Sequence, residues 1–275
     1  MAGESVLRDR LAVAAALNAQ GRFAVAARHY RALLREAAGD APDVYVQVRS
    51  LVGLAQCVAE HSGSIEEALG YLSTAESVSG AQAPGLLVLV HGQRGLLLHR
   101  AGRAVEAVRA MDRGLTGVVD LSAPEVPVLL LNRGSLRLEL GDIPGATDDL
   151  SRAVDLALAR DDVLVASKAR HNLGYAEYLH GDLPAALRAM DEAAVEAPER
   201  HAAVGLIDRA QVLLDAGLLT EADDALREAR EHLVRYRMVR DLAEVDLVRS
   251  RVVLGLRRYA DARRLARSAA SRALA

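Results

Sequence analysis

Aromatic side chains are scarce in this sequence, and tryptophan is absent. Phe, Trp and Tyr together make up 3% of the chain, which is too little for the stacking platforms that bind single-stranded nucleic acid. The formal net charge of −3 gives no general attraction to nucleic acid or to an anionic membrane surface. We therefore expect neither a nucleic-acid partner nor a membrane partner.

Cysteine and lysine each occur once, as Cys57 and Lys168. A single cysteine excludes an internal disulfide and is consistent with the reducing cytoplasm, where we expect the protein to reside. Cys57 and His61 are four residues apart, a spacing that puts two side chains on one face of a helix. Because Cys57 lies in an apolar segment, where cysteine acts as a small hydrophobe, we predict a packing residue and not a catalytic dyad.

Long apolar runs are missing as well. None approaches the roughly 18 residues that a membrane span needs. The short run from Leu11 to Leu17 is similar to the core of a signal peptide, but Glu4 and Asp9 stand where such a leader is basic. We predict that this run belongs to a helix of the folded protein.

The short motifs that carry catalytic chemistry are also absent. The eight histidines are scattered without metal-ligand spacing, and there is no H-E-x-x-H pair, no G-x-x-x-x-G-K phosphate loop and no G-x-S-x-G elbow. We expect no metal, no cofactor and no enzymatic activity.

What the chain does contain is a repeat of small residues. In the segment HGDLPAALRAMDEAA, Gly181 is followed after five, nine and twelve residues by Ala186, Met190 and Ala193. Small or apolar residues recur at the same offsets from Gly21, Gly63, Gly102, Gly141 and Gly217, and three alanines do so from Arg257. The intervals between these turn positions run from 36 to 42 residues, a period typical of stacked supersecondary units.

Each unit is interpreted as a helix, a turn at glycine, and a second helix. Glycine ends a helix readily because it adopts positive φ. Asp142 and Asp182 follow two of the turn glycines as helix N-caps, and Pro144 and Pro184 come two residues later, near the start of the second helix. Gly174, seven residues before its turn, would let the paired helix approach closely.

The segment from Asn172 to Pro198 resembles a tetratricopeptide repeat, with Gly174, Ala186, Met190, Ala193 and Pro198 at that family's small, bulky and closing positions. We therefore predict an all-α, right-handed α-solenoid of about seven such helix-turn-helix units. A globular all-α bundle is the alternative. The predicted single domain spans residues 1–275, with units at approximately 7–40, 44–80, 84–120, 124–160, 163–198, 202–236 and 241–275.

A narrower resemblance covers three segments. Residues 171–193, 206–229 and 240–250 look like the amino-terminal repeat arm of actinobacterial CHAT proteins, in which such an arm precedes a caspase-like peptidase domain. This likeness covers the arm only and implies a regulatory or partner-sensing module. The alternative function is a ligand-responsive helical domain of a bacterial transcription regulator, although no helix-turn-helix with basic phosphate contacts is evident.

The tetratricopeptide resemblance also implies where a partner binds. In that family the first helices of successive units line a concave surface, and carrying its contact positions onto this chain predicts a partner-binding set of Lys168, His171, Asn172, Tyr175, Tyr178, Asn132, Ser135, Gln93, His99, Asp208 and Gln211. This mixed polar surface is suited to an extended peptide. The family's carboxylate clamp is incomplete, because Leu131 stands where a cation would help.

The last unit is basic and the fourth is acidic. We interpret both as solvated helix faces, with docking of an acidic partner as the alternative for the basic end. The final helix has no evident polar cap, so we expect a peptidase domain or a second copy of the chain to cover that end. The predicted function is a non-catalytic scaffold or sensor that binds protein.

Overall fold

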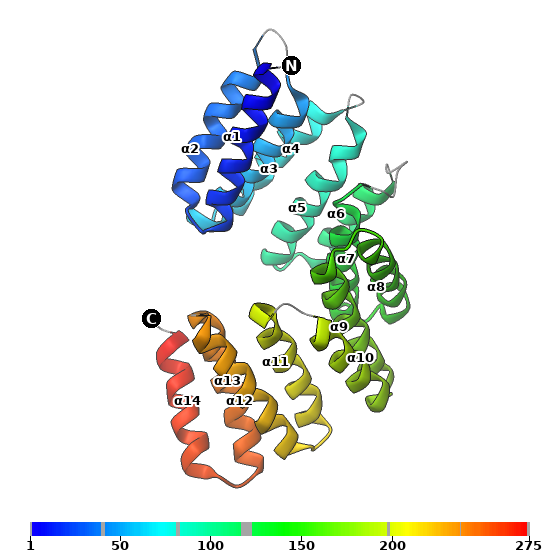
Figure 1. Cartoon of the computed structure of the whole chain (residues 1–275), viewed down its shortest axis with the longest axis vertical. Helices are drawn as coiled ribbons and strands as arrows, with labels where there is room; N and C mark the ends of the chain where they lie inside the picture. The colour runs from blue at the N-terminus through cyan, green and yellow to red at the C-terminus, as the bar shows by residue number, and fades with distance from the viewer. Residues whose placement is uncertain are drawn as a thin grey trace. The chain divides into compact units, whose positions relative to one another are not determined.

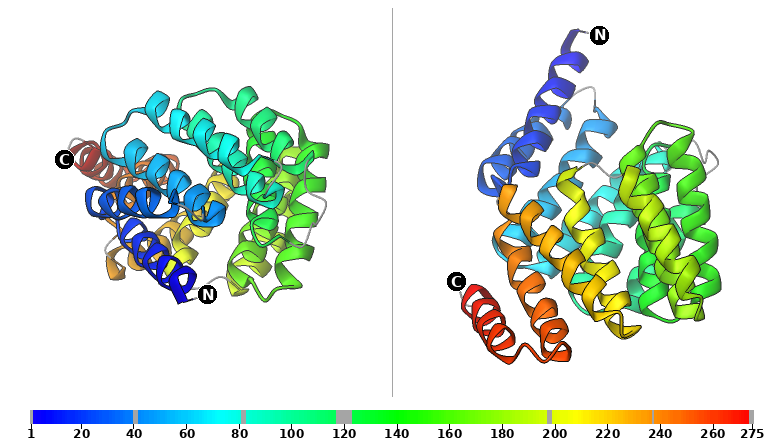
Figure 2. Two further views of the ribbon diagram at one scale, coloured as in Figure 1. Left: turned by 90° about the horizontal axis from the view of Figure 1, so that it is seen from above. Right: turned by 60° about the horizontal axis from the view of Figure 1, so that its bottom comes forward.

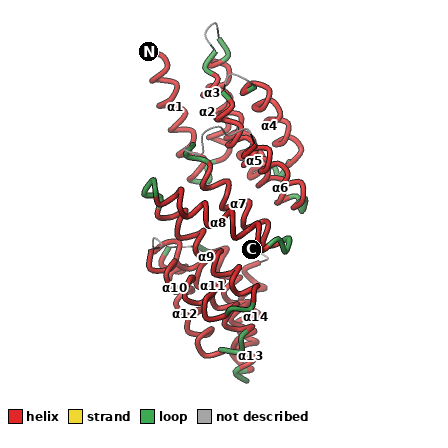
Figure 3. Tube along the Cα trace, turned by 90° about the vertical axis from the view of Figure 1, so that its right-hand side faces the viewer, coloured by secondary structure: helices red, strands yellow, loops and turns green. Residues whose placement is uncertain are grey.

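The computed structural model describes residues 2–39, 42–80, 83–116, 123–196, 199–236 and 238–273. Within these ranges the chain is helical and contains no strand (Figure 3). The predicted closing residue Pro198 lies outside the described residues. The contacts divide the chain into two compact units, Met1–Asp142 (unit 1) and Ile143–Ala275 (unit 2).

Unit 1 contains seven α-helices and one short 3-10 helix among its described residues (Figure 1). Consecutive helices run antiparallel and pack as hairpins, as the views in Figure 2 also show. The α-helices are α1 (Ala2–Ala19), α2 (Phe23–Ala37), α3 (Val44–His61), α4 (Ile65–Ser79), α5 (Leu87–Arg100), α6 (Ala104–Thr116) and α7 (Val126–Glu139), with the 3-10 turn at Pro84–Leu86 before α5.

Unit 2 continues the same alternation. Its described helices are α8 (Ile143–Leu158), α9 (Val163–His180), α10 (Leu183–Glu196), α11 (Glu199–Asp215), α12 (Leu219–Arg235), α13 (Val239–Gly255) and α14 (Tyr259–Ala273). The division between the units falls in the turn between α7 and α8. Within unit 1 the helices pair as α1–α2, α3–α4 and α5–α6, and within unit 2 as α9–α10, α11–α12 and α13–α14. The division of the whole chain into seven units stays a prediction.

The turns within these pairs adopt the left-handed backbone that the glycines predicted. Gly181 has φ +92° and Gly21 has φ +73°. At Gly181 the turn is closed by two backbone hydrogen bonds, from Gly181 N–H to Tyr178 O and from Asp182 N–H to Glu177 O. Arg257 takes the same conformation with φ +60°, so the last turn keeps its geometry without glycine.

Aspartate caps start the helices of the fifth pair. The Asp162 carboxylate accepts a hydrogen bond from the Val165 N–H at 3.1 Å, and the Asp182 carboxylate accepts one from the Ala185 N–H at 2.9 Å. Each bond satisfies one of the N–H groups that the first turn of a helix leaves without an intrahelical partner. The predicted cap at Asp182 is confirmed.

The small residues lie where helix meets helix. Ala186, Met190 and Ala193 are all buried, and a Cβ on Gly174 would lie 2.9 Å from the Ala186 carbonyl oxygen. The predicted close approach of α9 and α10 is therefore confirmed. The last pair departs from the pattern, because Ala266 is exposed and Leu265 is buried in its place. Within unit 2, α13 is the helix that packs most extensively on α14.

Candidate partner-binding surfaces

The predicted binding residues of unit 2 lie on the first helices of their pairs. Several of them form hydrogen bonds with one another or with Asp215. His171 Nε2 on α9 is 3.1 Å from Asp208 Oδ2 on α11. The Tyr178 hydroxyl donates to Asp215 Oδ2 at 3.2 Å, and the Gln211 amide donates to the other oxygen of Asp215 at 2.8 Å. These bonds connect α9 and α11 along one face of unit 2.

The same network continues to α13. Arg251 donates to Gln211 Oε1 at 3.1 Å. The Tyr175 and Tyr178 rings are 5.8 Å apart, with Tyr175 the more exposed of the two. Burial and the adjacent Asp215 carboxylate raise the pKa of the Tyr178 phenol, so it remains a hydrogen-bond donor at neutral pH. Lys168 is exposed on the same helix.

In unit 1 the predicted residues fall into two environments. His99 Nε2 is 2.9 Å from Glu139 Oε2, and the Ser135 hydroxyl donates to Leu131 O of its own helix at 2.8 Å. Gln93 and Asn132 line a hollow of about 390 Å³ between α5 and α7. Its apolar lining includes the exposed side chains of Leu96 and Val128, which gives this hollow amide and apolar contacts together.

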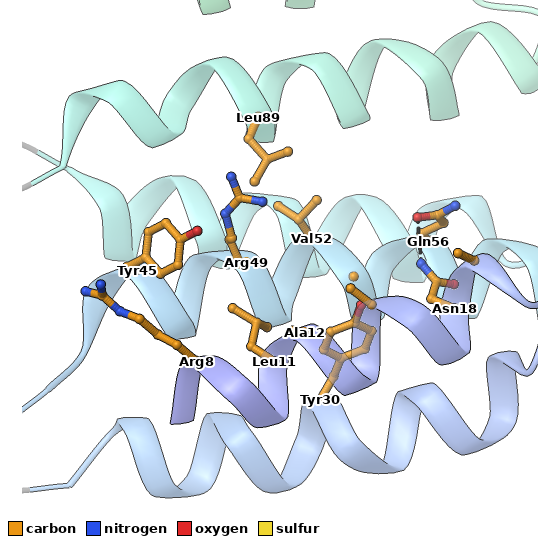
Figure 4. A pocket seen from close by; sticks show the side chains of 13 residues that line it. Arg8, Leu11, Ala12, Asn18, Tyr30, Tyr45, Arg49, Val52, Gln56 and Leu89 are labelled. Carbon is orange, nitrogen blue, oxygen red and sulfur yellow. Dashed lines mark hydrogen bonds between the residues drawn. The ribbon is translucent and has the colours of Figure 1, made fainter. Parts of the chain in front are cut away.

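A second hollow, of about 540 Å³, lies over α1 and α3 and was not predicted from the sequence (Figure 4). The guanidinium groups of Arg8 and Arg49 lie 5.2 and 5.0 Å from the centre of the Tyr45 ring, within the range of cation–π attraction. Away from these three residues, Asn18 donates a hydrogen bond to Gln56 at 2.8 Å. Leu11 and Val52 lie between the two polar groups, and Leu89 lies beside Arg49 (Figure 4).

The repeat register contained a signal for this hollow. Arg8 lies thirteen residues before its turn glycine, as Lys168 does before Gly181. In the second pair, the residue thirteen positions before Gly63 is Ser50, whose side chain is fully buried. Arg49, one residue earlier, is the partly exposed residue. Because of this shift of one residue, counting back from the turn glycine does not place Arg49 at the position equivalent to Arg8.

Cys57 is a packing residue, as predicted. Its side chain is 1% exposed, and its thiol donates to Asn18 Oδ1 at 3.4 Å. Burial raises the pKa of the Cys57 thiol to about 11, which leaves almost no thiolate at neutral pH. Elsewhere in the described chain, no group of three or more His, Cys, Asp or Glu side chains is placed to hold a metal ion. None of the described helices has the length and apolarity to cross a bilayer.

No protein-family model and no curated protein matches the chain in sequence. Solved structures match it in three dimensions. A tetratricopeptide repeat protein from Parabacteroides merdae is 16% identical, with a TM-score of 0.66 over 96% of this chain and 92% of its own. A Rap protein complexed with competence and sporulation factor is 11% identical, with a TM-score of 0.73 over 98% and 77%.

A third match is a signal transduction ATPase with numerous domains from Pyrococcus horikoshii that carries a tetratricopeptide repeat sensor. It is 16% identical, with a TM-score of 0.67 over 90% of this chain and 39% of its own. This chain has the tetratricopeptide-repeat fold. The predicted all-α solenoid class is therefore confirmed, and the tetratricopeptide pattern of glycines and alanines accounts for the helix contacts in both units.

Proposed function

We propose that this chain is a non-catalytic module that binds a protein or peptide partner on the first helices of its tetratricopeptide pairs. The observation that carries the proposal is the pair of hollows in unit 1. They adjoin at Arg49 and Leu89, which line both, and they offer cationic, amide and apolar groups along α1, α3, α5 and α7. Pockets that combine apolar area with a few polar groups are typical binding sites.

Two of the structural neighbours agree with this proposal. The Rap protein was solved in complex with a competence and sporulation factor, and the Pyrococcus protein carries its repeats as a sensor. In unit 2, Lys168, Tyr175 and Asp208 are the predicted contact residues that are exposed. The network of Asp208, Gln211 and Asp215 would hold the surface beside them in a fixed arrangement.

An affinity experiment tests the proposal. The full chain is immobilised and incubated with lysate of its native host, and bound proteins are quantified by mass spectrometry. The test variant carries Tyr175→Ala and Tyr178→Ala, and the matched control is Arg188→Ala, an exposed residue on the second helix α10. We expect the control to retain the partner and the double variant to release it at an unchanged melting temperature.

Two outcomes would contradict parts of this proposal. A partner that the double variant retains in full removes the assignment of Tyr175 and Tyr178. If no protein is enriched over an unrelated immobilised protein, the chain is not an interaction module.

We further propose a CHAT-type, caspase-like peptidase as the partner that this module regulates in the cytoplasm. The support is the sequence likeness of residues 171–193, 206–229 and 240–250 to the repeat arm of CHAT proteins. Co-expression with each such peptidase of the host, followed by a cleavage assay, tests it. We expect the chain to change the peptidase rate; a rate that is the same with and without the chain contradicts this assignment.

Self-association at the carboxyl-terminal pair is the second proposed contact. Leu254 on α13 and Tyr259 on α14 are 53% and 64% exposed, and both are available for contact with a second copy. Size-exclusion chromatography with light scattering is the test, and we expect a dimer that Tyr259→Ser converts to a monomer. A wild-type monomer at high concentration contradicts it.

A further inference from the structure

Of the two arginines of the α1–α3 hollow, Arg49 lies where the two hollows of unit 1 meet, and Arg8 lines the α1–α3 hollow alone. Arg49 lines both, and Arg8 lies on the opposite side of the α1–α3 hollow from Leu89 (Figure 4). Among the side chains that the structure describes, Arg8 has no carboxylate within ion-pair distance; its recorded contact is with the Tyr45 ring. A carboxylate bound at this ring would meet two guanidinium groups, whose planar sets of N–H donors suit carboxylate oxygens.

Only some of the hydrogen-bond donors of Arg49 have a partner among its neighbours. One of its terminal nitrogens forms an ion pair with Glu125, while its Nε is buried without a hydrogen-bond partner among the described residues. Arg8, Arg49 and Glu125 together leave one positive charge at this point. A carboxylate from a ligand would neutralise this charge.

The surroundings of these arginines are apolar on both sides. Leu11 and Val52 line the hollow over α1 and α3, and Leu96 and Val128 line the hollow over α5 and α7. Amide side chains also line each hollow: Asn18 and Gln56 in one, Gln93 and Asn132 in the other. Amides of this kind are suited to the backbone of an extended chain.

We infer that unit 1 binds an extended peptide segment in which an Asp or Glu side chain, flanked by apolar residues, contacts Arg8 and Arg49. An internal acidic side chain fits better than a carboxyl terminus, because Arg49 lies where the two hollows adjoin and a bound chain continues to both sides. The inference rests on the proposed function and adds the class of peptide.

A selection followed by binding measurements tests this inference. Random twelve-residue peptides displayed on phage are selected on the wild-type chain, and enriched sequences are synthesised with amidated carboxyl termini. We expect enrichment of an acidic residue between apolar ones. By fluorescence anisotropy, Glu→Gln or Asp→Asn in the peptide should weaken binding about tenfold or more, as expected for loss of charge-assisted hydrogen bonds.

Protein variants provide the matching half of the test. The double variant Arg8→Gln/Arg49→Gln should bind the peptide about tenfold or more weakly. Its affinity should not fall further when the Asp or Glu of the peptide is also replaced. Glu125→Gln should tighten binding, because it removes a carboxylate that competes for Arg49. Arg28→Gln, at an exposed arginine on α2 outside both hollows, is the control that should leave affinity unchanged. Circular dichroism checks that each variant is folded, and the peptide substitution gives the answer if the double variant unfolds.

The outcomes separate the two proposals. A selection that enriches no peptide contradicts the proposed function and this inference with it. Peptides that bind without an acidic residue, or with equal affinity for the double arginine variant, overturn the inference alone. Peptides that lose binding on amidation overturn the assignment to an internal side chain.

Discussion

Glycines of this chain have different surroundings, and substitution should distinguish them. Gly174 on α9 would place a Cβ 2.9 Å from both Ala186 O and Met190 Cγ, whereas a Cβ on Gly70 of α4 would meet nothing within 4 Å. We predict that Gly174→Ala lowers the free energy of unfolding by about 1–3 kcal/mol through overpacking. Gly70→Ala should raise it by about 0.5–1 kcal/mol, because alanine favours the helix. Urea unfolding of both variants checks this pair, and equal effects would contradict the described contact.

The last turn provides a second comparison at single residues. Arg257 has φ +60° and Gly181 has φ +92°. A side chain in the left-handed region costs about 1–2 kcal/mol, of which about 0.4–1 kcal/mol is offset by the lower entropy of the unfolded chain. We predict that Arg257→Gly stabilises the protein by about 0.5–1 kcal/mol and that Gly181→Ala destabilises it by a similar amount. Opposite shifts of the urea midpoint are the expected result; shifts of the same sign would contradict it.

His91 should make stability depend on pH. Its side chain is 4% exposed, and its Nε2 lies 3.7 Å from Glu76 Oε1, with Arg94 and Arg113 also nearby. Burial lowers the pKa of His91 below 6.5, against the opposing effect of Glu76. The unfolded chain therefore binds a proton more readily than the folded one, so stability is full above pH 6.5 and falls as the pH drops through and below that value.

The matched variant for this prediction is His91→Gln. Between about pH 7.5 and 5.5, the wild type should lose stability more steeply than the variant, by up to about 1.4 kcal/mol per pH unit. Urea unfolding at a series of pH values measures the two slopes, whatever the variant does to absolute stability. Parallel slopes would show that His91 titrates normally in the folded protein.

At the scale of helices, one buried carboxylate joins the last elements of unit 2. Asp223 on α12 is 6% exposed and pairs with Arg249 on α13 at 2.6 Å and with Arg258, just before α14, at 3.0 Å. Its neighbour Asp224 is exposed and pairs with Arg227 one turn along the same helix.

We predict that Asp223→Ala lowers the free energy of unfolding by about 3–5 kcal/mol, because it leaves two arginines without their buried partner. Asp224→Ala should change it by less than about 0.5 kcal/mol, as is usual for an exposed pair. Thermal and urea unfolding of the two variants make the comparison. A small effect of Asp223→Ala would mean that water replaces the carboxylate at both arginines.

The helices and their contacts could be predicted because they depend on local rules. A glycine that reverses the chain and an alanine that admits a neighbouring helix each restrict the residue allowed at one position. The hollow at Arg8, Tyr45 and Arg49 depends on which side chains from different pairs come together. Arg49 was missed because the second pair is displaced by one residue, so that Ser50 occupied the expected position. Similarly, the spacing placed Ala266 inside a helix contact, but Ala266 is exposed and Leu265 is buried in its place.

At the scale of the whole molecule, the sequence predicts one domain through residues 1–275, and this stays a prediction. The repeat pattern runs through Gly141 without interruption, at the turn where the two compact units divide. In an array whose neighbouring repeats stabilise one another, a local defect lowers the stability of the whole. We therefore expect Gly174→Ala in unit 2 to shift a single calorimetric transition to lower temperature. Two separate transitions, of which only one moves, would show that the units unfold independently.

The single lysine of the chain has a practical consequence. Lys168 is exposed on α9, so an amine-selective acylating reagent has one side-chain target there, besides the terminal amine. The thiol of Cys57 is buried with its pKa raised to about 11, which protects it from maleimides at neutral pH. A dye coupled to Lys168 and a second dye on a cysteine introduced in unit 1 would therefore report the distance between the two units, with only one substitution in the chain.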